Sequence, residues 1–261
     1  MMSALWVSKT GLSAQDRRMT TIANNLANAA TVGFKRDDVM FEDLLYQTRR
    51  QPGAASSQIT QLPSGMQLGT GVRVAGTSKQ FTEGSLQITE RSLDIAVNGR
   101  GFFEVQMPDG TIAYTRNGQF HINSDGELVT TNGLLVQPGV AIPQDAQTIT
   151  ISEDGIVEVT IHGEAEPQQI GQIQLTDFIN PSGLQAIGSN LFLETAASGA
   201  PQQGQPGNNG LGRVQQGALE NSNVDVVEEL VNMITTQRTY EMNSKVISTT
   251  DQMLQFITQT L

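Results

Sequence analysis

Few residues of this 261-residue chain have the chemistry of a catalytic or metal-binding site, and they are poorly grouped. The only histidines, His121 and His162, stand in strand-like runs, where a histidine is far more often a surface residue than a base or a ligand. The stretch from His121 to Asn132 resembles a calcium-binding loop in outline. Its first ligand position is wrong, however, and Asn132 stands where a bidentate acid belongs, so an Asp-Gly hairpin explains the stretch better.

The carboxylates and glycines are no better placed for catalysis. Glu153 and Asp154 could supply one half of the acid pair of a glycoside hydrolase, but they precede Gly155 and favour a turn. The run Gly99–Gly101 also indicates a turn, because no strand–helix–strand unit follows it as in a dinucleotide site. The sequence has no phosphate-binding loop, serine-nucleophile elbow or zinc spacing. We therefore expect no enzyme activity, no metal and no cofactor.

The composition excludes several classes of partner and site. With a net charge of −11, the chain is a poor match for nucleic acid or an anionic membrane surface, which need basic patches. It has no cysteine, so it has no disulfide framework or thiolate metal site, and the redox compartment stays open. The first ten residues hold one lysine and no apolar core of signal-peptide length, and no run approaches the roughly 20 apolar residues that span a bilayer. We expect neither a cleavable secretory signal nor insertion into a membrane.

The elements that organise this chain lie at its two ends. From Val224 to Leu261 the sequence has no proline or glycine and predicts one long helix, capped by Ser222 or Asn223. Apolar residues recur in it every seven positions, the period of a seam that packs against another helix. They are Val226, Met233, Tyr240, Ile247, Leu254 and Leu261. Further apolar residues widen this face: Val227, Leu230, Ile234, Val246, Met253 and Ile257.

A matching seam opens the chain. Residues 3–29 predict a helix whose apolar residues also stand seven apart, at Leu5, Leu12, Met19 and Leu26. One interpretation is a helix pair inside a single globular domain. Two helices enclose little volume, however, and each would leave much of its apolar seam in water. We therefore favour a coiled-coil domain that is completed by assembly of many chains.

The C-terminal helix has an unusual polar face. From Asn232 to Leu261 it holds fifteen Ser, Thr, Asn and Gln residues against four charged ones. Solvent-facing helices prefer Glu, Lys and Arg, and Thr and Asn are mediocre helix formers. Such a helix draws its stability from packing. Its polar face either lines a neutral, wet channel or is a loosely optimised surface.

The middle of the chain predicts an antiparallel β-domain rich in hairpins. Short strand-like runs are separated by Asn-Gly or Asp-Gly pairs, which suit tight turns because Gly and Asn accept positive φ. These pairs begin at Asn98, Asp109, Asn117, Asp125, Asn132 and Asp154. Residues 196–212 indicate a flexible connection, and Arg213–Glu220 a last strand.

The predicted fold class is α+β, with a discontinuous helical coiled-coil domain from both termini and an inserted antiparallel, hairpin-rich β-domain. We assign residues 1–45 and 221–261 to the helical domain and residues 73–220 to the β-domain. Residues 46–72 contain prolines and glycines and show no clear period, so we expect an extended linker or arm there.

The string TTIANNLANAATVGFKRDDVMFEDLL, residues 20–45, resembles the N-terminal signature of the flagellar rod and hook proteins. The likeness continues through LDIAVNGRGFFEVQ, AYTRNGQF and the closing EELVNMITTQRTYEMNSKVISTTDQML, so it covers essentially the whole chain. Within that family, the stretch Tyr46–Val72 resembles the members that build the distal rod.

The resemblance implies a structural subunit of the bacterial flagellar basal body, which polymerises into the straight, rigid distal rod and transmits torque through the periplasm and outer membrane. It implies a helical tube with the terminal helices in its inner layer and the β-domain outside. It also implies export by the flagellar type III route. The implied partners are further copies of the chain, other rod subunits, the rod cap, hook subunits, and the P-ring and L-ring proteins.

Three hypotheses assign roles to particular residues. The first is that the seam residues carry assembly. The second is that the arm lies across a neighbouring subunit and stiffens the polymer, through Tyr46, Arg49, Arg50, Gln51, Pro52 and Pro63; the alternative is a passive linker. The third rests on resemblance: Phe41 and Leu45 match the Phe-x-x-x-hydrophobic element that early flagellar substrates present to the export gate. The alternative is that these two residues simply pack, four apart, on a short helix.

Two other functions stay open. A proximal rod or hook subunit of the same family would have the same ends, but a hook subunit would lack the Tyr46–Val72 stretch. A periplasmic carbohydrate-binding or hydrolytic β-domain with helical dimerisation tails would need a pocket of carboxylates and aromatic residues. Aromatic residues make up only 5% of the chain, which disfavours that function.

Overall fold

The computed structural model describes residues 2–52, 63–161 and 166–260, and the chain divides into two compact units. The helical unit combines the segments Met1–Ala27, Asp37–Ser78 and Asp225–Leu261. The β-rich unit combines Asn28–Arg36 and Lys79–Val224. This division differs from the expected one, because most of the predicted linker groups with the helices and residues 28–36 group with the strands.

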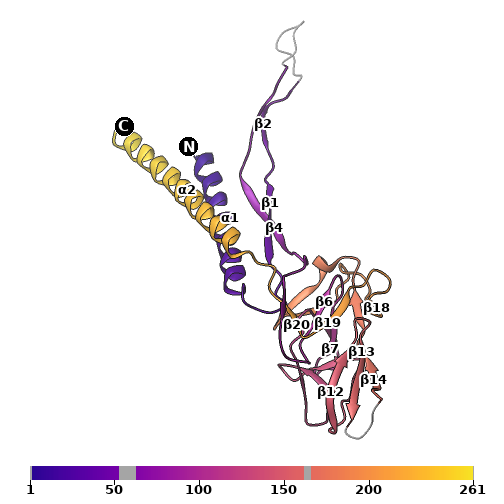
Figure 1. Cartoon of the computed structure of the whole chain (residues 1–261). Coiled ribbons are helices and arrows are strands. Elements are labelled where there is room, and N and C mark those ends of the chain that lie inside the picture. Colours follow the sequence, from indigo (N-terminus) through magenta and orange to yellow (C-terminus); the bar gives the residue numbers. More distant parts are fainter. Residues whose placement is uncertain (1, 53–62, 162–165, 261) are drawn as a thin grey trace. The chain divides into compact units, whose positions relative to one another are not determined.

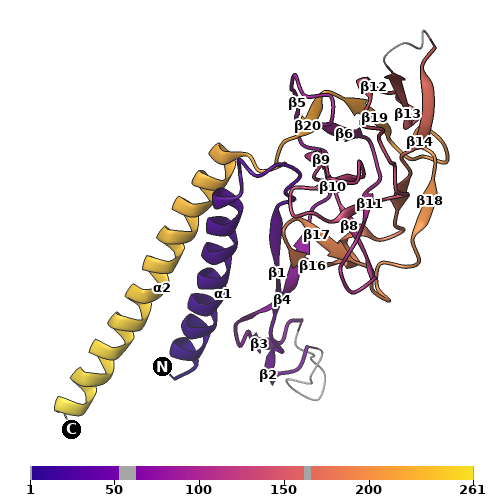
Figure 2. The same cartoon turned by 90° about the horizontal axis from the view of Figure 1, so that it is seen from below.

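Two long helices, α1 (Met2–Ala27) and α2 (Val226–Thr260), form the main part of the helical unit. They lie side by side along much of their length (Figure 1 and Figure 2). Both agree with the predicted helices to within two residues at each end. With the strands described below, they confirm an α+β fold.

The start of α2 differs from the prediction in its capping residue. The Asp225 carboxylate accepts the N–H groups of Val227 at 2.8 Å and Glu228 at 3.2 Å, the geometry of an N-cap. The prediction of Ser222 or Asn223 is therefore wrong. Asn223 has another role, because its side chain accepts the Arg36 N–H at 2.8 Å within the β-rich unit.

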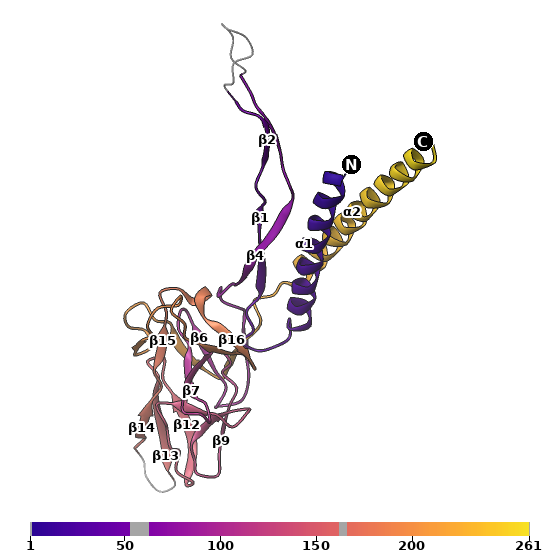
Figure 3. The same cartoon turned by 180° about the vertical axis from the view of Figure 1, so that it is seen from behind.

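A two-stranded ribbon completes the helical unit (Figure 3). Strand β1 (Asp37–Asp43) pairs with β4 (Val72–Lys79), and β2 (Gln47–Arg50) pairs antiparallel with β3 (Met66–Leu68). The linker prediction is thus wrong for the paired residues, whereas residues 53–62 lie outside the described part of the chain. A short helix around Phe41 is also wrong, because β4 supplies strand partners for that backbone.

The β-rich unit is built on a seven-stranded sheet with the order β16-β17-β8-β7-β11-β10-β9. Its strands are β7 (Phe103–Gln106), β8 (Ile112–Thr115), β9 (Phe120–Ile122), β10 (Leu128–Thr130), β11 (Leu135–Gln137), β16 (Gln185–Gly188) and β17 (Leu191–Leu193). A three-stranded sheet contains β12 (Ala146–Ile151), β13 (Ile156–Ile161) and β14 (Gln168–Gln172).

Three further strand pairs and a short 3-10 helix complete this unit. The pairs are β5 (Leu86–Ile88) with β20 (Ala218–Glu220), β6 (Ile95–Asn98) with β19 (Arg213–Gln216), and β15 (Leu175–Asp177) with β18 (Gln202–Gly204). The 3-10 helix η1 spans Pro181–Gly183. All the pairings with a resolved register are antiparallel, as the turn pattern predicts.

The Asn-Gly and Asp-Gly pairs divide into two groups. Those ending at Gly110, Gly126, Gly133 and Gly155 have the expected positive φ at glycine and join strands that pair with each other. The pairs at Asn98 and Asn117 do not form hairpins, because β6 pairs with β19 and β8 pairs with β17. Gly118 allows a close approach instead, since a Cβ there would lie 1.5 Å from the Ile95 carbonyl oxygen.

The core of the β-rich unit is a continuous apolar cluster contributed by both sheets. Phe103 and Phe120 are fully buried in it, with ring centroids 5.1 Å apart in an edge-to-face arrangement. Leu211 belongs to the same cluster, and Gln202–Gly204 forms β18. The prediction that residues 196–212 form a flexible connection is therefore wrong.

Candidate assembly surface

The two helices meet along a row of polar residues. Glu229, Thr236 and Thr250 are the most buried residues of α2, although none of them is apolar. Asn243, seven residues after Thr236, continues the row and faces Gly11 of α1, where an added Cβ would lie 3.2 Å from its amide nitrogen. Small side chains therefore let the helices approach closely, and the sequence analysis missed this row.

The threonine hydroxyls on α2 are satisfied by the helix itself. Thr236 donates to the Asn232 carbonyl at 2.7 Å, and Thr250 donates to the Val246 carbonyl at 2.7 Å. Thr235 and Thr239 make the same bond to the preceding turn. A hydroxyl bonded in this way can be buried without cost from a missing partner. The Thr-rich composition thus suits a packed helix, and part of the supposed polar face lies against α1.

The predicted seam residues lie beside this polar row rather than in it. Most are half-buried: Leu5, Leu12, Met19 and Leu26 on α1, and Met233, Ile247 and Leu254 on α2. Val226 and Tyr240 are exposed. The helix pair therefore shields one side of each seam and leaves the other side open.

A second apolar row runs along the opposite side of α2. Its members recur at intervals of three or four residues, as a helical stripe requires. The row, called here the outer stripe, consists of Val227, Val231, Ile234, Met242, Val246, Met253 and Phe256, all exposed. The sequence analysis placed several of these on one widened face with the seam. The structure separates them, because 3.6 residues make a turn and α1 covers only one side.

One asparagine ties the elements of the helical unit together. The side chain of Asn25 accepts the Asp37 N–H at 2.9 Å and donates to the Asp37 carbonyl at 2.9 Å. It also donates to the Glu229 carboxylate at 3.2 Å. Asn25 thus holds the end of α1, the start of β1 and the first turns of α2 at one buried point.

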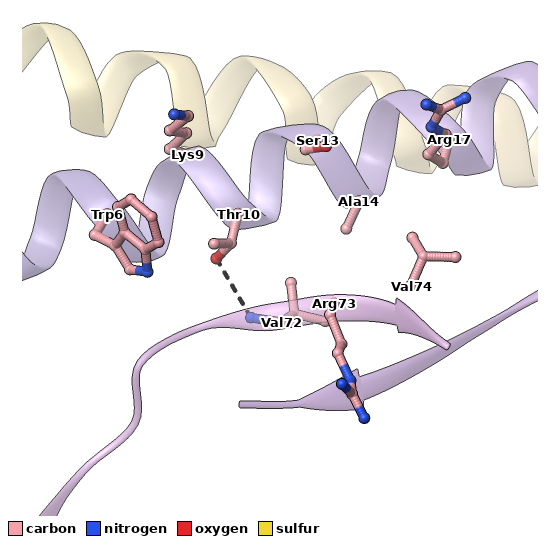
Figure 4. Close-up of a pocket in the computed structure, with 9 residues that line it drawn as sticks. All are labelled: Trp6, Lys9, Thr10, Ser13, Ala14, Arg17, Val72, Arg73 and Val74. Atoms are coloured by element: carbon pink, nitrogen blue, oxygen red, sulfur yellow. Dashed lines mark hydrogen bonds between the residues drawn. The ribbon is translucent and has the colours of Figure 1, made fainter. Parts of the chain in front are cut away.

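A groove runs between α1 and β4 within the helical unit (Figure 4). It encloses a cavity of about 380 Å³ lined by Trp6, Lys9, Thr10, Ser13, Ala14, Arg17, Val72, Arg73 and Val74. The Thr10 hydroxyl accepts the Val72 N–H at 3.3 Å and fixes the strand against the helix. The Lys9 ammonium lies 5.6 Å from the centroid of the Trp6 ring, within cation–π range.

The β-rich unit contains a buried charge cluster around Glu220. The Lys35 ammonium lies 2.6 Å from the Glu220 carboxylate and donates to the Thr82 carbonyl at 2.6 Å. The Arg116 guanidinium lies 3.4 Å from the second Glu220 oxygen. Burial lowers the pKa of Lys35, and the Glu220 charge opposes that shift. The cluster fastens the segment Asn28–Arg36 to β20, and only the position of Lys35 in the N-terminal signature hinted at it.

The residues considered for catalysis or metal binding have ordinary structural roles. Asn123 accepts the N–H groups of Asp125 at 2.9 Å and Glu127 at 2.8 Å, which makes a turn of the supposed calcium loop. Glu153 pairs with Arg213 at 2.6 Å on the surface. Within the described residues no group of three His, Asp or Glu side chains is placed to hold a metal, and His162 lies outside them.

The arm and export residues lie on the ribbon and beside it. Tyr46, Arg49, Arg50, Gln51, Pro52 and Pro63 are all exposed. Phe41 is half-buried on β1, whereas Leu45 is 90% exposed. Neither of the helices described above has the length and apolarity to cross a membrane.

Three family descriptions match successive parts of the chain. "Flagella basal body rod protein" matches residues 5–35, "Flagellar hook protein FlgE/F/G D1 domain" matches residues 96–159, and "Flagellar basal body rod FlgEFG protein C-terminal" matches residues 215–260. These regions cover α1 with the segment after it, part of the β-rich unit, and α2 with the strands before it.

Curated relatives match over nearly the full length. A flagellar basal-body rod protein FlgG of Buchnera aphidicola is 55% identical over 99% of this chain and 100% of its own. The protein of that name in Borreliella burgdorferi is 50% identical over 97% of both chains. The protein of that name in Caulobacter vibrioides is 49% identical over 99% of both chains.

Proposed function

This chain belongs to the family of flagellar basal-body rod proteins, and we propose that it builds the straight, distal part of the rod. It is a structural subunit of the flagellar basal body, as the likeness to rod proteins over the full length shows. The finer assignment to the distal rod is supported by the presence of residues 46–72, the stretch that resembles distal members.

The outer stripe of α2 carries the proposal that the helices form the inner layer of a polymer. Val227 is 70% exposed and Phe256 is 68% exposed, at opposite ends of a 35-residue helix. Contiguous exposed apolar surface of this kind marks an interaction site. The half-buried seam beside it, from Met233 to Leu254, offers a second row. In the proposed coiled-coil layer, neighbouring subunits cover both rows, and the β-rich units form the outer wall.

Partners and location follow from the position in the rod. The subunit would contact copies of itself, other rod subunits, the rod cap and hook subunits along the axis. The P-ring and L-ring proteins would surround it. The rod segment would reach from the periplasm to the outer membrane, and its subunits would arrive by the flagellar type III export route.

Electron microscopy of the concentrated, purified protein tests this function. Straight tubes of uniform diameter are the expected result. Curved tubes would favour a hook-like subunit of the same family. A protein that stays monomeric at every concentration would count against the polymer-forming role.

Deleting residues 46–63 is expected to yield polymers that still form but curve or flex. A tube bends when neighbouring subunits slide along its axis, and an arm laid across the neighbour would oppose sliding at every subunit. The prolines at both ends of the segment restrict the arm further. The measurement is polymer curvature and persistence length in micrographs.

A second variant separates arm contacts from arm length. Replacing Tyr46, Arg49 and Arg50 with serine keeps the chain length and removes the exposed aromatic and charged groups. Contacts that stiffen the tube predict flexible polymers here as well. Straight polymers of unchanged stiffness from the deletion would show the segment to be a passive linker.

Phe41→Ala is expected to lower export of the subunit without unfolding the β-rich unit. The change removes the aromatic residue of the proposed export element, and Phe41 is only half-buried on β1. Secreted protein in culture medium and circular dichroism of the purified variant are the two readouts. Met40→Ala, at the neighbouring exposed position, is the matched control. Equal secretion of both variants would leave Phe41 with a packing role only.

A further inference from the structure

The groove between α1 and β4 combines an apolar floor with a basic rim. Trp6, Ala14 and Val74 supply apolar surface, and Lys9, Arg17 and Arg73 supply cations (Figure 4). Arg73 is held by a 2.7 Å ion pair with Glu42. Among the described residues, Lys9 and Arg17 bind no carboxylate, so their charges are available to another molecule.

The two helices of the unit carry opposite charge. α1 has Lys9, Arg17 and Arg18 against Asp16, a net charge of +2, although the whole chain carries −11. α2 has a net charge of −2, from two cations (Arg238, Lys245) and four carboxylates (Glu228, Glu229, Glu241, Asp251). A surface of one helix is therefore complementary to a surface of the other.

The first three turns of α2 match the groove in shape and charge. Val227, Val231 and Ile234 form the most exposed part of the outer stripe, with 70%, 58% and 51% exposure. Their spacing is that of the anchors of a helix that docks in a groove. The exposed carboxylates of Asp225 and Glu228 flank them. Beyond Ile234, the same face continues with Arg238 and Lys245, which a basic rim would repel, so the matching surface ends there.

We propose that this groove binds residues 225–234 of α2 from a second copy of the chain. The proposal rests on the proposed function and names the partner of its assembly surface. The two surfaces differ and lie on the same chain, so the contact is heterologous, and each copy offers both a free groove and a free helix face. Such a contact extends into an open helical polymer unless its rotation closes a ring.

Cross-linking between copies tests the contact directly. The chain has no cysteine, so a disulfide forms only between introduced residues. A mixture of Val74→Cys and Val231→Cys proteins, oxidised under polymerising conditions, is expected to give a dimer with one copy of each. Ile88→Cys, 81% exposed on β5, is the control and should cross-link poorly with Val74→Cys.

The competing occupant is the acidic β-rich unit of a neighbour, which has sixteen carboxylates and seven cations. Preferential cross-linking of Val74→Cys with Glu153→Cys, rather than with Val231→Cys, would overturn the proposal. Absence of any cross-link above the control in wild-type-like polymers would overturn it too.

Charge reversal supplies an independent test. Arg17→Glu and Glu228→Arg should each raise the critical concentration for polymerisation at least about tenfold, because like charges at an interface are strongly unfavourable. Combining both changes in one chain should restore most of the loss. Arg18→Glu alters the adjacent exposed cation, which does not line the groove, and should polymerise like the wild type.

Normal polymerisation of Arg17→Glu, or no recovery in the combined variant, would contradict the groove contact. In either case, straight wild-type tubes would leave the rod function standing. Wild-type protein that never polymerises would instead count against the rod function itself, and the cross-linking at high concentration would still decide the groove contact.

Discussion

Lys35→Met is expected to lower the free energy of unfolding of the β-rich unit by about 3–5 kcal/mol, the usual cost of breaking a buried ion pair from one side. The Lys35 side chain is 0% exposed, and its ammonium is 2.6 Å from the Glu220 carboxylate. Methionine has a similar volume but donates no hydrogen bond. The variant would leave Glu220 and the Thr82 carbonyl buried without their closest donor.

Denaturant unfolding, followed by the near-ultraviolet circular dichroism of buried Tyr114, measures this effect in the correct unit. Lys245→Met is the matched control, because Lys245 is exposed on α2 and such surface changes alter stability by about 0.5 kcal/mol or less. A loss below about 1 kcal/mol for Lys35→Met would show that the cluster contributes little, since removing one partner of a buried pair ordinarily costs far more.

Ile247→Asp is expected to abolish polymerisation while the β-rich unit stays folded. Ile247 is a half-buried seam residue whose open side lies beside the helix contact. A carboxylate there would have to be desolvated at each subunit contact, which costs several kcal/mol when the group stays charged. The loss repeats at every subunit, so the polymer is affected far more than the isolated chain.

Sedimentation at a concentration where wild-type protein forms tubes is the measurement, with circular dichroism to establish that the β-rich unit remains folded. Ser248→Asp is the matched control, because it adds the same charge at the next, exposed position of α2. Tubes from Ile247→Asp at the wild-type concentration would refute the assignment of the seam to assembly.

Local sequence was sufficient to predict the elements whose stability depends on neighbouring residues. The helices follow from long segments without proline and from apolar residues seven apart, and their observed ends lie within two residues of the prediction. The hairpins at Gly110, Gly126, Gly133 and Gly155 follow from glycines that accept positive φ. Family and rod function were also accessible, because a long signature string such as residues 20–45 is specific by itself.

The faces of α2 could be predicted only in part. Periodicity identifies apolar rows, but it does not say which row another element covers. The structure buries Glu229, Thr236 and Thr250 and exposes Val227 and Phe256, the reverse of what polarity predicts. Bonds from threonine hydroxyls to the preceding turn, and the Asn25–Glu229 hydrogen bond, make that burial possible.

Contacts between distant parts of the chain were decided by tertiary structure alone. Lys35 and Glu220 are 185 residues apart, and β1 finds its partner in β4 across the predicted linker. Asn98 and Asn117 carry the same turn signal as true hairpins, yet the strands before them pair with β19 and β17. The amino-acid sequence by itself determined the helices, most strands and the family. Which strands pair, which helix face is covered and which charges meet depend on burial summed over both ends of the chain, a quantity that no local pattern contains.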